Sequence, residues 1–97
     1  MVRHIVFWNI KADAEGGREH CCKLIKQKLE ALVGVVPGLL KLEVGINYNP
    51  AGHDLCLLSE LTDREALDGY QNHPAHLEAA GYVRSVTEGR AVCDCEF

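Results

Sequence analysis

The stretch from Tyr70 to Glu78 concentrates the side chains that could carry out acid–base chemistry. Tyr70, His73 and His76 fall within seven residues of one another and flank Pro74. A histidine titrates near neutral pH and a phenol can donate a proton, so a tyrosine and a histidine suit chemistry that passes through an enolate. Tyr70 and His76 are therefore candidate acid–base groups.

The same stretch also has a purely structural interpretation. The residue before a proline is pushed out of the α region, whereas proline is tolerated in the first turn of a helix, so one helix ends near His73 and another begins at Pro74. His73 would then cap the second helix, and His76 would satisfy buried backbone groups at the corner. The break also argues against His73 and His76 acting as a metal-binding pair on one helical face. Both interpretations, catalytic and structural, remain open at this point.

His4 is a third candidate, because it shares an expected strand face with Val6 and Trp8. A lone histidine among apolar neighbours is more often a satisfied core residue than a catalytic one. If the three groups form a functional cavity, we expect its histidines to be only partly buried and to titrate near neutral pH.

Other motifs for cofactors or metals are missing from the sequence. The five cysteines show no C-x-x-C spacing, which predicts reduced thiols packed in the core rather than a zinc site or disulfides. The turn Asn47–Gly52 lacks the patterns that cradle phosphates, so no nucleotide is expected. We therefore expect no cofactor and no metal, and we interpret Arg84, Arg90 and the lysines as solvated surface.

Length and charge limit the classes of protein further. A chain of 97 residues predicts one domain, residues 1–97. The net charge of −4, with scattered Lys and Arg, argues against a nucleic-acid partner. No apolar run is long enough to span a membrane, and Met1 is followed at once by a strand-like segment rather than by a signal peptide. These features predict a cytoplasmic protein with no membrane partner.

Hydrophobic periodicity predicts the elements that position the candidate groups. In chain order they are a strand Val2–Ile10, a helix Arg18–Val33, strands Leu39–Asn47 and Leu55–Leu61, helices from Asp63 and from Pro74 towards Glu88, and a strand Arg90–Glu96. Thr62 to Glu65 has the form of a capping box, which predicts Thr62 as the N-cap. Alternation places Leu40 on the apolar face of its strand, and helical spacing places Leu77 inward.

The order βαββαβ predicts an α+β, ferredoxin-like fold with a four-stranded antiparallel sheet. Right-handed crossovers place the first and third strands in the middle, which gives the strand order 4-1-3-2 with all helices on one face. Both central strands are apolar on their two faces, so the helix-free face would expose a large apolar patch in a monomer. We therefore expect a second copy of the chain to cover it in a homodimer.

Several segments resemble the stress-responsive A/B barrel domain family, a group of dimeric α+β barrels. The resemblance runs nearly end to end, over residues 2–8, 37–38, 53–55, 63–70 (DREALDGY) and 73–77 (HPAHL). Its most specific part is the combination of the last two segments. It implies a homodimer whose sheets enclose a cavity, often with no assigned reaction. A branch of the family consists of aromatic polyketide cyclases that use a tyrosine and a histidine of this region as acid–base groups.

On this chain the matching positions are Tyr70 and His76, and the opening histidine of the family corresponds to His4. The chain departs from the family pattern at Leu61, where an aromatic residue is common, and at Cys95, where tyrosine is common; both departures imply a reshaped cavity. Some plant members bind a metal ion, but this sequence has no convincing carboxylate or histidine cluster. Two classes of function follow: a barrel that binds a small apolar or aromatic ligand without catalysis, or a cofactor-free enzyme of the cyclase or lyase type.

Overall fold

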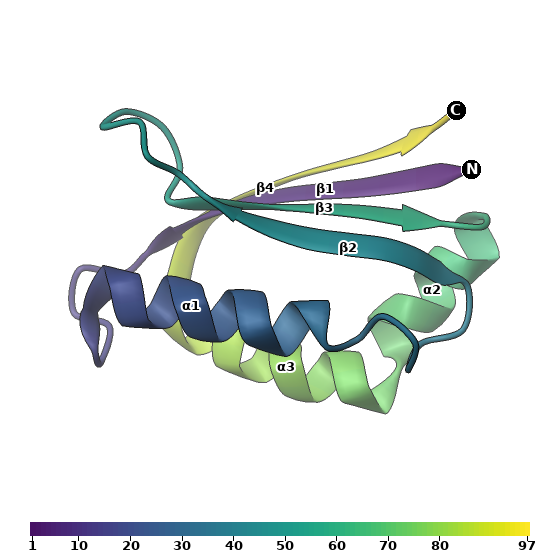
Figure 1. Ribbon diagram of the computed structural model, residues 1–97, viewed down its shortest axis with the longest axis horizontal. Helices are drawn as coiled ribbons and strands as arrows, with labels where there is room; N and C mark the ends of the chain where they lie inside the picture. The colour runs from purple at the N-terminus through teal and green to yellow at the C-terminus, as the bar shows by residue number, and fades with distance from the viewer.

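The computed structural model describes residues 1–97 and contains four strands and three helices (Figure 1). In chain order they are β1 (Val2–Ile10), α1 (Gly17–Glu30), β2 (Leu39–Ile46), β3 (Leu55–Leu61), α2 (Arg64–Asn72), α3 (Pro74–Val86) and β4 (Thr87–Glu96). The order βαββαβ is as predicted, with the second helical segment divided at His73 and Pro74.

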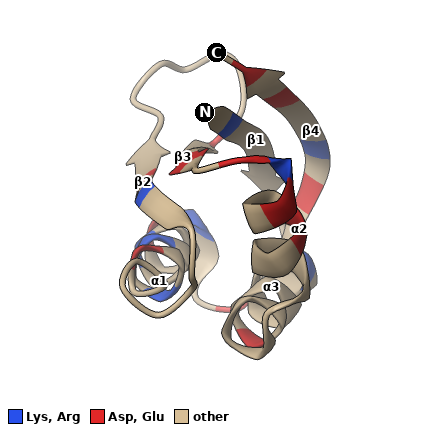
Figure 2. Ribbon diagram, turned by 90° about the vertical axis from the view of Figure 1, so that its right-hand side faces the viewer, with Lys and Arg blue, Asp and Glu red and all other residues tan.

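The four strands form one antiparallel sheet in the order β2-β3-β1-β4. This is the predicted order 4-1-3-2, counted from the other edge. All three helices lie beneath one face of the sheet, with α1 under the β2 side and α2 and α3 under the β1 and β4 side (Figure 2). The α+β, ferredoxin-like prediction is confirmed.

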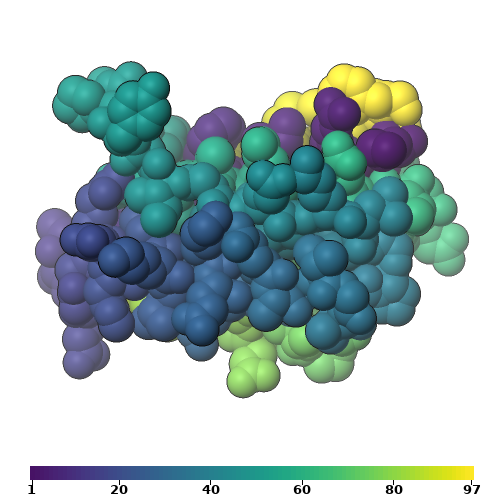
Figure 3. Space-filling model, in the orientation of Figure 1, coloured from purple at the N-terminus to yellow at the C-terminus, as the bar shows by residue number.

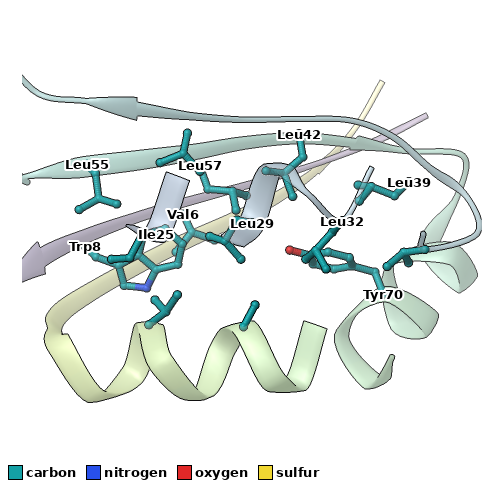
Figure 4. Close-up of a cluster of buried hydrophobic side chains, with 14 of the residues drawn as sticks. Val6, Trp8, Ile25, Leu29, Leu32, Leu39, Leu42, Leu55, Leu57 and Tyr70 are labelled. Atoms are coloured by element: carbon teal, nitrogen blue, oxygen red, sulfur yellow. The ribbon is translucent and has the colours of Figure 1, made fainter. Parts of the chain in front are cut away.

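The core fills the layer between the sheet and the helices. The helix α1 contributes Cys21, Cys22, Ile25 and Leu29, which recur at helical spacing and are all fully buried. The alternate residues of β1 and β3 meet them from the sheet side, and Figure 4 shows several of these side chains in the layer. One face of each central strand is therefore buried in the core.

The N-terminus of α2 differs from the predicted capping box. Asp63, not Thr62, is the N-cap: its backbone is extended, and its carboxylate accepts a hydrogen bond from the Ala66 backbone N–H at 2.8 Å. Both residue types cap helices well, and the choice between adjacent cap formers depends on where the chain leaves β3. The helix therefore starts one residue later, but it still carries Leu67 and Tyr70 inward.

Two expected core positions are on the surface instead. Leu40 is 52% exposed, because a register shift between Leu39 and Lys41 interrupts the alternation and buries Leu39 in its place. Leu77 is 49% exposed, because His76 takes the inward position one residue earlier on α3. On the strand β2, a shift of one residue reverses which side chain faces the core.

The helix-free face of the sheet, here called the open face, carries apolar side chains in solvent. Phe7 of β1 and Leu58 of β3 are 39% and 51% exposed, and the register places Cys93 of β4 on the same face. The turn 47–53 rises above one end of this face and the C-terminal residues rise above the other, which leaves a saddle between them (Figure 3).

Cys93 and Cys95 also lie on the open face, so the prediction that they are core thiols is wrong. Their sulfur atoms are 3.1 Å apart, and both thiols are free. Both follow the strand alternation, but they lie opposite Ile5 and Arg3, which face away from the helices. No segment of the chain covers this face. Cys21 and Cys22, by contrast, pack in the core as expected.

Candidate functional site

A cavity of about 410 Å³ opens between the sheet and the corner formed by α2 and α3. Its floor is made of buried side chains from β1, α1, β3, α2 and α3, and its mouth is bordered by exposed residues of α3 and β4. Fifteen residues line it: His4, Val6, Trp8, Leu29, Leu57, Tyr70, Gln71, His76, Ala80, Val83, Arg84, Thr87, Glu88, Gly89 and Arg90. The volume is in the range that accepts a small organic molecule.

Tyr70 forms part of the floor and is only 1% exposed. The face of α2 that buries Leu67 also turns the Tyr70 ring inward, and Figure 4 shows its hydroxyl directed into the layer between sheet and helices. This hydroxyl makes no hydrogen bond within the chain. Every side-chain polar atom that is fully enclosed does have a partner, so the Tyr70 hydroxyl is not fully enclosed and can be reached from the cavity. Burial raises the pKa of Tyr70 to about 12, which keeps the phenol protonated and makes it a hydrogen-bond donor.

His76 lies in the first turn of α3, with its ring centroid 4.3 Å from that of Tyr70. Its Nδ1 lies 3.3 Å from the Gln71 carbonyl oxygen, which can only accept, so Nδ1 carries the proton. Burial lowers the pKa of His76, the hydrogen bond to Gln71 opposes this shift, and smaller electrostatic contributions from His4, Arg84 and Arg90 lower the pKa further. The ring is therefore neutral at neutral pH, and its Nε2 is left as a base.

His4 faces Tyr70 from β1, with their ring centroids 6.1 Å apart. Its Nδ1 lies 2.5 Å from Oδ1 of Asp94, the residue opposite it on β4. A carboxylate accepts this hydrogen bond, so Nδ1 carries the proton and Nε2 is available to the cavity. His4 is only 4% exposed, so the expectation that both histidines would be partly buried is wrong for this residue. The hydrogen bond to Asp94 explains how a buried histidine is accommodated there.

The structure thus brings Tyr70, His76 and His4 together on one cavity. His73 is not among the lining residues: its Nδ1 accepts a hydrogen bond from the Ala75 backbone N–H at 3.1 Å and caps α3. Leu61 and Cys95, the two departures from the family pattern, do not line the cavity either. The predicted reshaping of the barrel cavity through these two residues stays a prediction.

Sequence reasoning missed three charged residues at the site. Asp94 pairs with His4 across the sheet, and the only signal for it is the strand register, which becomes visible once β1 and β4 are aligned. Arg84 and Arg90 were interpreted as solvated surface, but both border the mouth of the cavity. No group of three metal-ligating side chains comes together anywhere in the chain, and no helix has the length and apolar character needed to cross a membrane.

The fold and the site define a class: small α+β proteins of ferredoxin-like topology with a cavity between the sheet and the helices. Within that class, residues 2–97 match the Stress responsive A/B Barrel Domain, so the chain belongs to this family. No functionally curated protein matches the chain.

Solved structures with the same fold come from bacteria and plants. A dimeric protein of unknown function from Bacteroides fragilis is 31% identical, with a TM-score of 0.89 over 99% of this chain and 95% of that chain. A dimeric protein of unknown function from Jannaschia is 26% identical, with a TM-score of 0.82 over 99% and 98% of the two chains. A hydroxynitrile lyase from Passiflora edulis is 21% identical, with a TM-score of 0.81 over 97% and 90%, a likeness that shows the fold alone.

Proposed function

We propose that this chain forms a homodimer in which each subunit binds a small, largely apolar or aromatic carbonyl compound and moves a proton on it without a cofactor. The observation that carries the proposal is the convergence of three acid–base side chains, Tyr70, His76 and His4, on one accessible cavity. A core packed only for stability has no need of a phenol without a partner inside it.

The state of each group suggests its part in the reaction. The neutral Tyr70 phenol donates a hydrogen bond to the carbonyl oxygen of the ligand, where negative charge develops. A histidine Nε2 takes the proton from the adjacent carbon, and the electron pair of the broken C–H bond forms the enolate. The enolate either recovers a proton or attacks a second carbonyl in the same molecule, which closes a ring.

The two histidines differ in how they are held. His4 is braced by the carboxylate of Asp94, which stabilises its protonated form once a proton has arrived. His76 is held by a neutral carbonyl and has a lowered pKa, so its ring is neutral and its Nε2 is free to accept a proton. We therefore assign His76 as the base that abstracts the proton, and His4, once it has taken up a proton from solvent, as the group that returns one to the enolate. Asp94 acts only through His4 and is a positioning residue.

The homodimer rests on the open face and on the relatives. Phe7 and Leu58 expose apolar surface there that no segment of the chain covers. The proteins from Bacteroides fragilis and Jannaschia are both described as dimeric. A second copy on the open face would leave the cavity free, because the cavity lies on the helix side of the sheet.

Deuterium exchange tests the acid–base proposal without knowledge of the natural substrate. The purified protein is incubated with phenylacetone in D₂O, and the loss of the α-proton signals is followed by NMR. The wild type is expected to accelerate exchange, and His4→Gln and His76→Gln are expected to lose the acceleration. His20→Gln, a change on the exposed part of α1, serves as the matched control.

The second candidate function is binding without catalysis, and the family match favours it because the match names no reaction. Trp8 lines the cavity and is the only tryptophan, so its fluorescence reports occupancy. A ligand that changes Trp8 fluorescence while the wild type and both glutamine variants exchange α-protons at the same rate would establish the binding function and remove the acid–base one.

A further inference from the structure

The mouth of the cavity carries charges that the acid–base chemistry does not use. Arg84, in the last turn of α3, and Arg90, on β4, border the mouth from two different elements. Neither arginine takes part in any of the ion pairs of the chain, which involve Arg3, Arg18 and Arg64 instead. Two exposed guanidinium groups without carboxylate partners therefore stand where a ligand enters.

The burial of the lining residues divides the cavity into two zones. The floor residues Val6, Trp8, Leu57 and Val83 are buried and apolar, whereas Arg84, Glu88, Gly89 and Arg90 at the mouth are exposed. A ligand that satisfies both zones needs an apolar body and a polar or charged end. The body would lie against Tyr70 and the histidines, and the charged end would remain at the mouth.

A bulge in β4 lies beside Arg90 at the cavity. Phe7 pairs with Ala91 and Asn9 pairs with Glu88, so Gly89 and Arg90 together oppose the single residue Trp8. Gly89 has a φ of +66°, which glycine adopts without strain. Bulges are common beside functional sites, and Arg90, which would face the helix side in a regular strand as well, lies opposite Trp8 at the cavity.

The charge at the mouth indicates which ligand fits. Arg84 and Arg90 supply two positive charges and Glu88 supplies one negative charge, which leaves a net charge of +1 for one bound anion. Asp94 does not line the cavity, and its carboxylate is already paired with His4. The charges of both arginines are also among the smaller causes that lower the pKa of His76 on the floor, after burial.

We propose that the ligand of this cavity is a monoanionic carboxylic acid with an apolar acyl or aromatic body, whose carboxylate is bound at the mouth by Arg84 and Arg90. A guanidinium group matches a carboxylate through paired N–H donors, which fixes orientation as well as affinity. This inference rests on the proposed ligand-binding function and specifies its substrate class.

Binding of matched probes tests the inference. Octanoate, octan-1-ol and octyl phosphate share one apolar body and do not absorb where tryptophan is excited, so Trp8 fluorescence and calorimetry can follow all three. Octanoate is expected to bind the wild type at least about tenfold more tightly than octan-1-ol. This preference is expected to disappear in the double variant Arg84→Gln/Arg90→Gln, with the affinity for octan-1-ol unchanged.

The control variant is Arg64→Gln, which removes an exposed arginine that pairs with Glu96 outside the cavity and is expected to keep the preference. Equal binding of octanoate and octan-1-ol, or a preference that survives the double variant, overturns the carboxylate assignment but leaves the cavity as a binding site. Tighter binding of octyl phosphate than of octanoate overturns the monoanion assignment. No response to any probe overturns the inference together with the proposed function.

Discussion

Tyr70 and His4 are both almost fully buried, but only His4 has a polar partner inside the chain. The Tyr70 hydroxyl is accessible only from the cavity, so its hydrogen bond is left for a ligand. The two residues should therefore respond differently to substitution. Changes at Tyr70 should lower the reaction rate without lowering stability, whereas changes in the His4–Asp94 pair should also lower the free energy of unfolding.

Tyr70→Phe removes one hydroxyl and keeps the packing of the ring. The free energy of unfolding is expected to change by no more than about 0.5 kcal/mol, because no hydrogen bond within the chain is lost. The exchange rate of a bound ketone is expected to fall about 100-fold or more, as when one donor to a developing oxyanion is removed. Urea unfolding and NMR exchange measure the two quantities. Tyr48→Phe, on the fully exposed turn, is the control, and an unchanged rate in Tyr70→Phe would contradict the donor role.

Asp94→Ala leaves the buried Nδ1–H of His4 without an acceptor. We expect the free energy of unfolding to fall by about 1–3 kcal/mol, the usual cost of an unsatisfied buried polar group. Asp94→Asn retains an acceptor oxygen and should lose less. Asp13→Ala removes an exposed carboxylate from a loop and should have no measurable effect. If Asp94→Ala and the wild type had the same free energy of unfolding, the His4–Asp94 contact would make no net contribution to stability.

The lowered pKa of His76 predicts the pH dependence. Proton abstraction requires the neutral ring of His76, so kcat/KM should rise with pH along an acid limb whose midpoint lies below 6.5, the ordinary value. Stability has the same sign: between the folded pKa and 6.5 the unfolded chain binds more protons, so stability falls as pH drops through this window. A histidine NMR titration assigned with His76→Gln checks the shift, and a midpoint at or above 6.5 would contradict it.

At the scale of elements, the bulge of β4 links the strand to the site. Gly89 has a positive φ, and a Cβ built there would lie 2.9 Å from Nδ2 of Asn9. The Gly89 carbonyl also accepts a hydrogen bond from Nε2 of His53 at 3.0 Å, which ties the bulge to the turn between β2 and β3. The bulge is therefore held from both neighbouring segments.

Gly89→Ala is expected to destabilise the fold by about 1–2 kcal/mol, because alanine in a left-handed conformation is strained even before the contact with Asn9 is relieved. Gly69→Ala is the matched control: Gly69 is exposed within α2 with open space around it, so alanine should stabilise the helix by up to about 1 kcal/mol. Thermal or urea unfolding measures the stability of both variants. If Gly89→Ala stabilised the fold as Gly69→Ala does, a side chain at the bulge would cause no strain.

The sequence predicts the elements and their order better than it predicts the irregular positions. Alternation and helical spacing depend on local chemistry, and they locate β1 and β3 to the residue. The bulges at Leu40 and Gly89 each reverse the side that a residue faces, and Asp94 meets His4 only through pairing across the sheet. Such features depend on long-range register, which local pattern does not contain. The candidate trio was predictable from residue type, whereas its charged neighbours were not.

At the scale of the whole molecule, the open face carries exposed apolar side chains beside the ion pairs Arg3–Glu60 and Lys41–Glu43. Leu58 lies in the middle of the open face on a central strand, and it is half exposed in the single chain. If a second copy covers this face, Leu58 becomes buried only in the dimer, so the dimer and the fold of each subunit can be separated experimentally.

Leu58→Asp is therefore expected to convert a dimer into a folded monomer. An interface of about 1,200–2,000 Å² cannot accommodate an unpaired carboxylate at its centre, while the subunit core does not contain Leu58. Sedimentation equilibrium at micromolar concentration measures the mass, and circular dichroism checks the fold. Leu77→Asp, an equally exposed change on the helix side, should leave the dimer intact. A wild-type protein that sediments as a monomer would remove the dimer proposal.

The two ends of the chain lie side by side where β1 and β4 meet (Figure 1). The Phe97 backbone N–H donates to the Met1 carbonyl at 2.9 Å, and the Met1 amino group donates to the Phe97 carbonyl at 3.2 Å. A short glycine linker could therefore join residue 97 to residue 1, and the chain could be reopened in the segment 31–38 on the helix side. Such a circular permutant would keep every strand pairing. It would also move any affinity tag from the edge of the open face to the opposite side of the molecule, where it cannot obstruct a second copy.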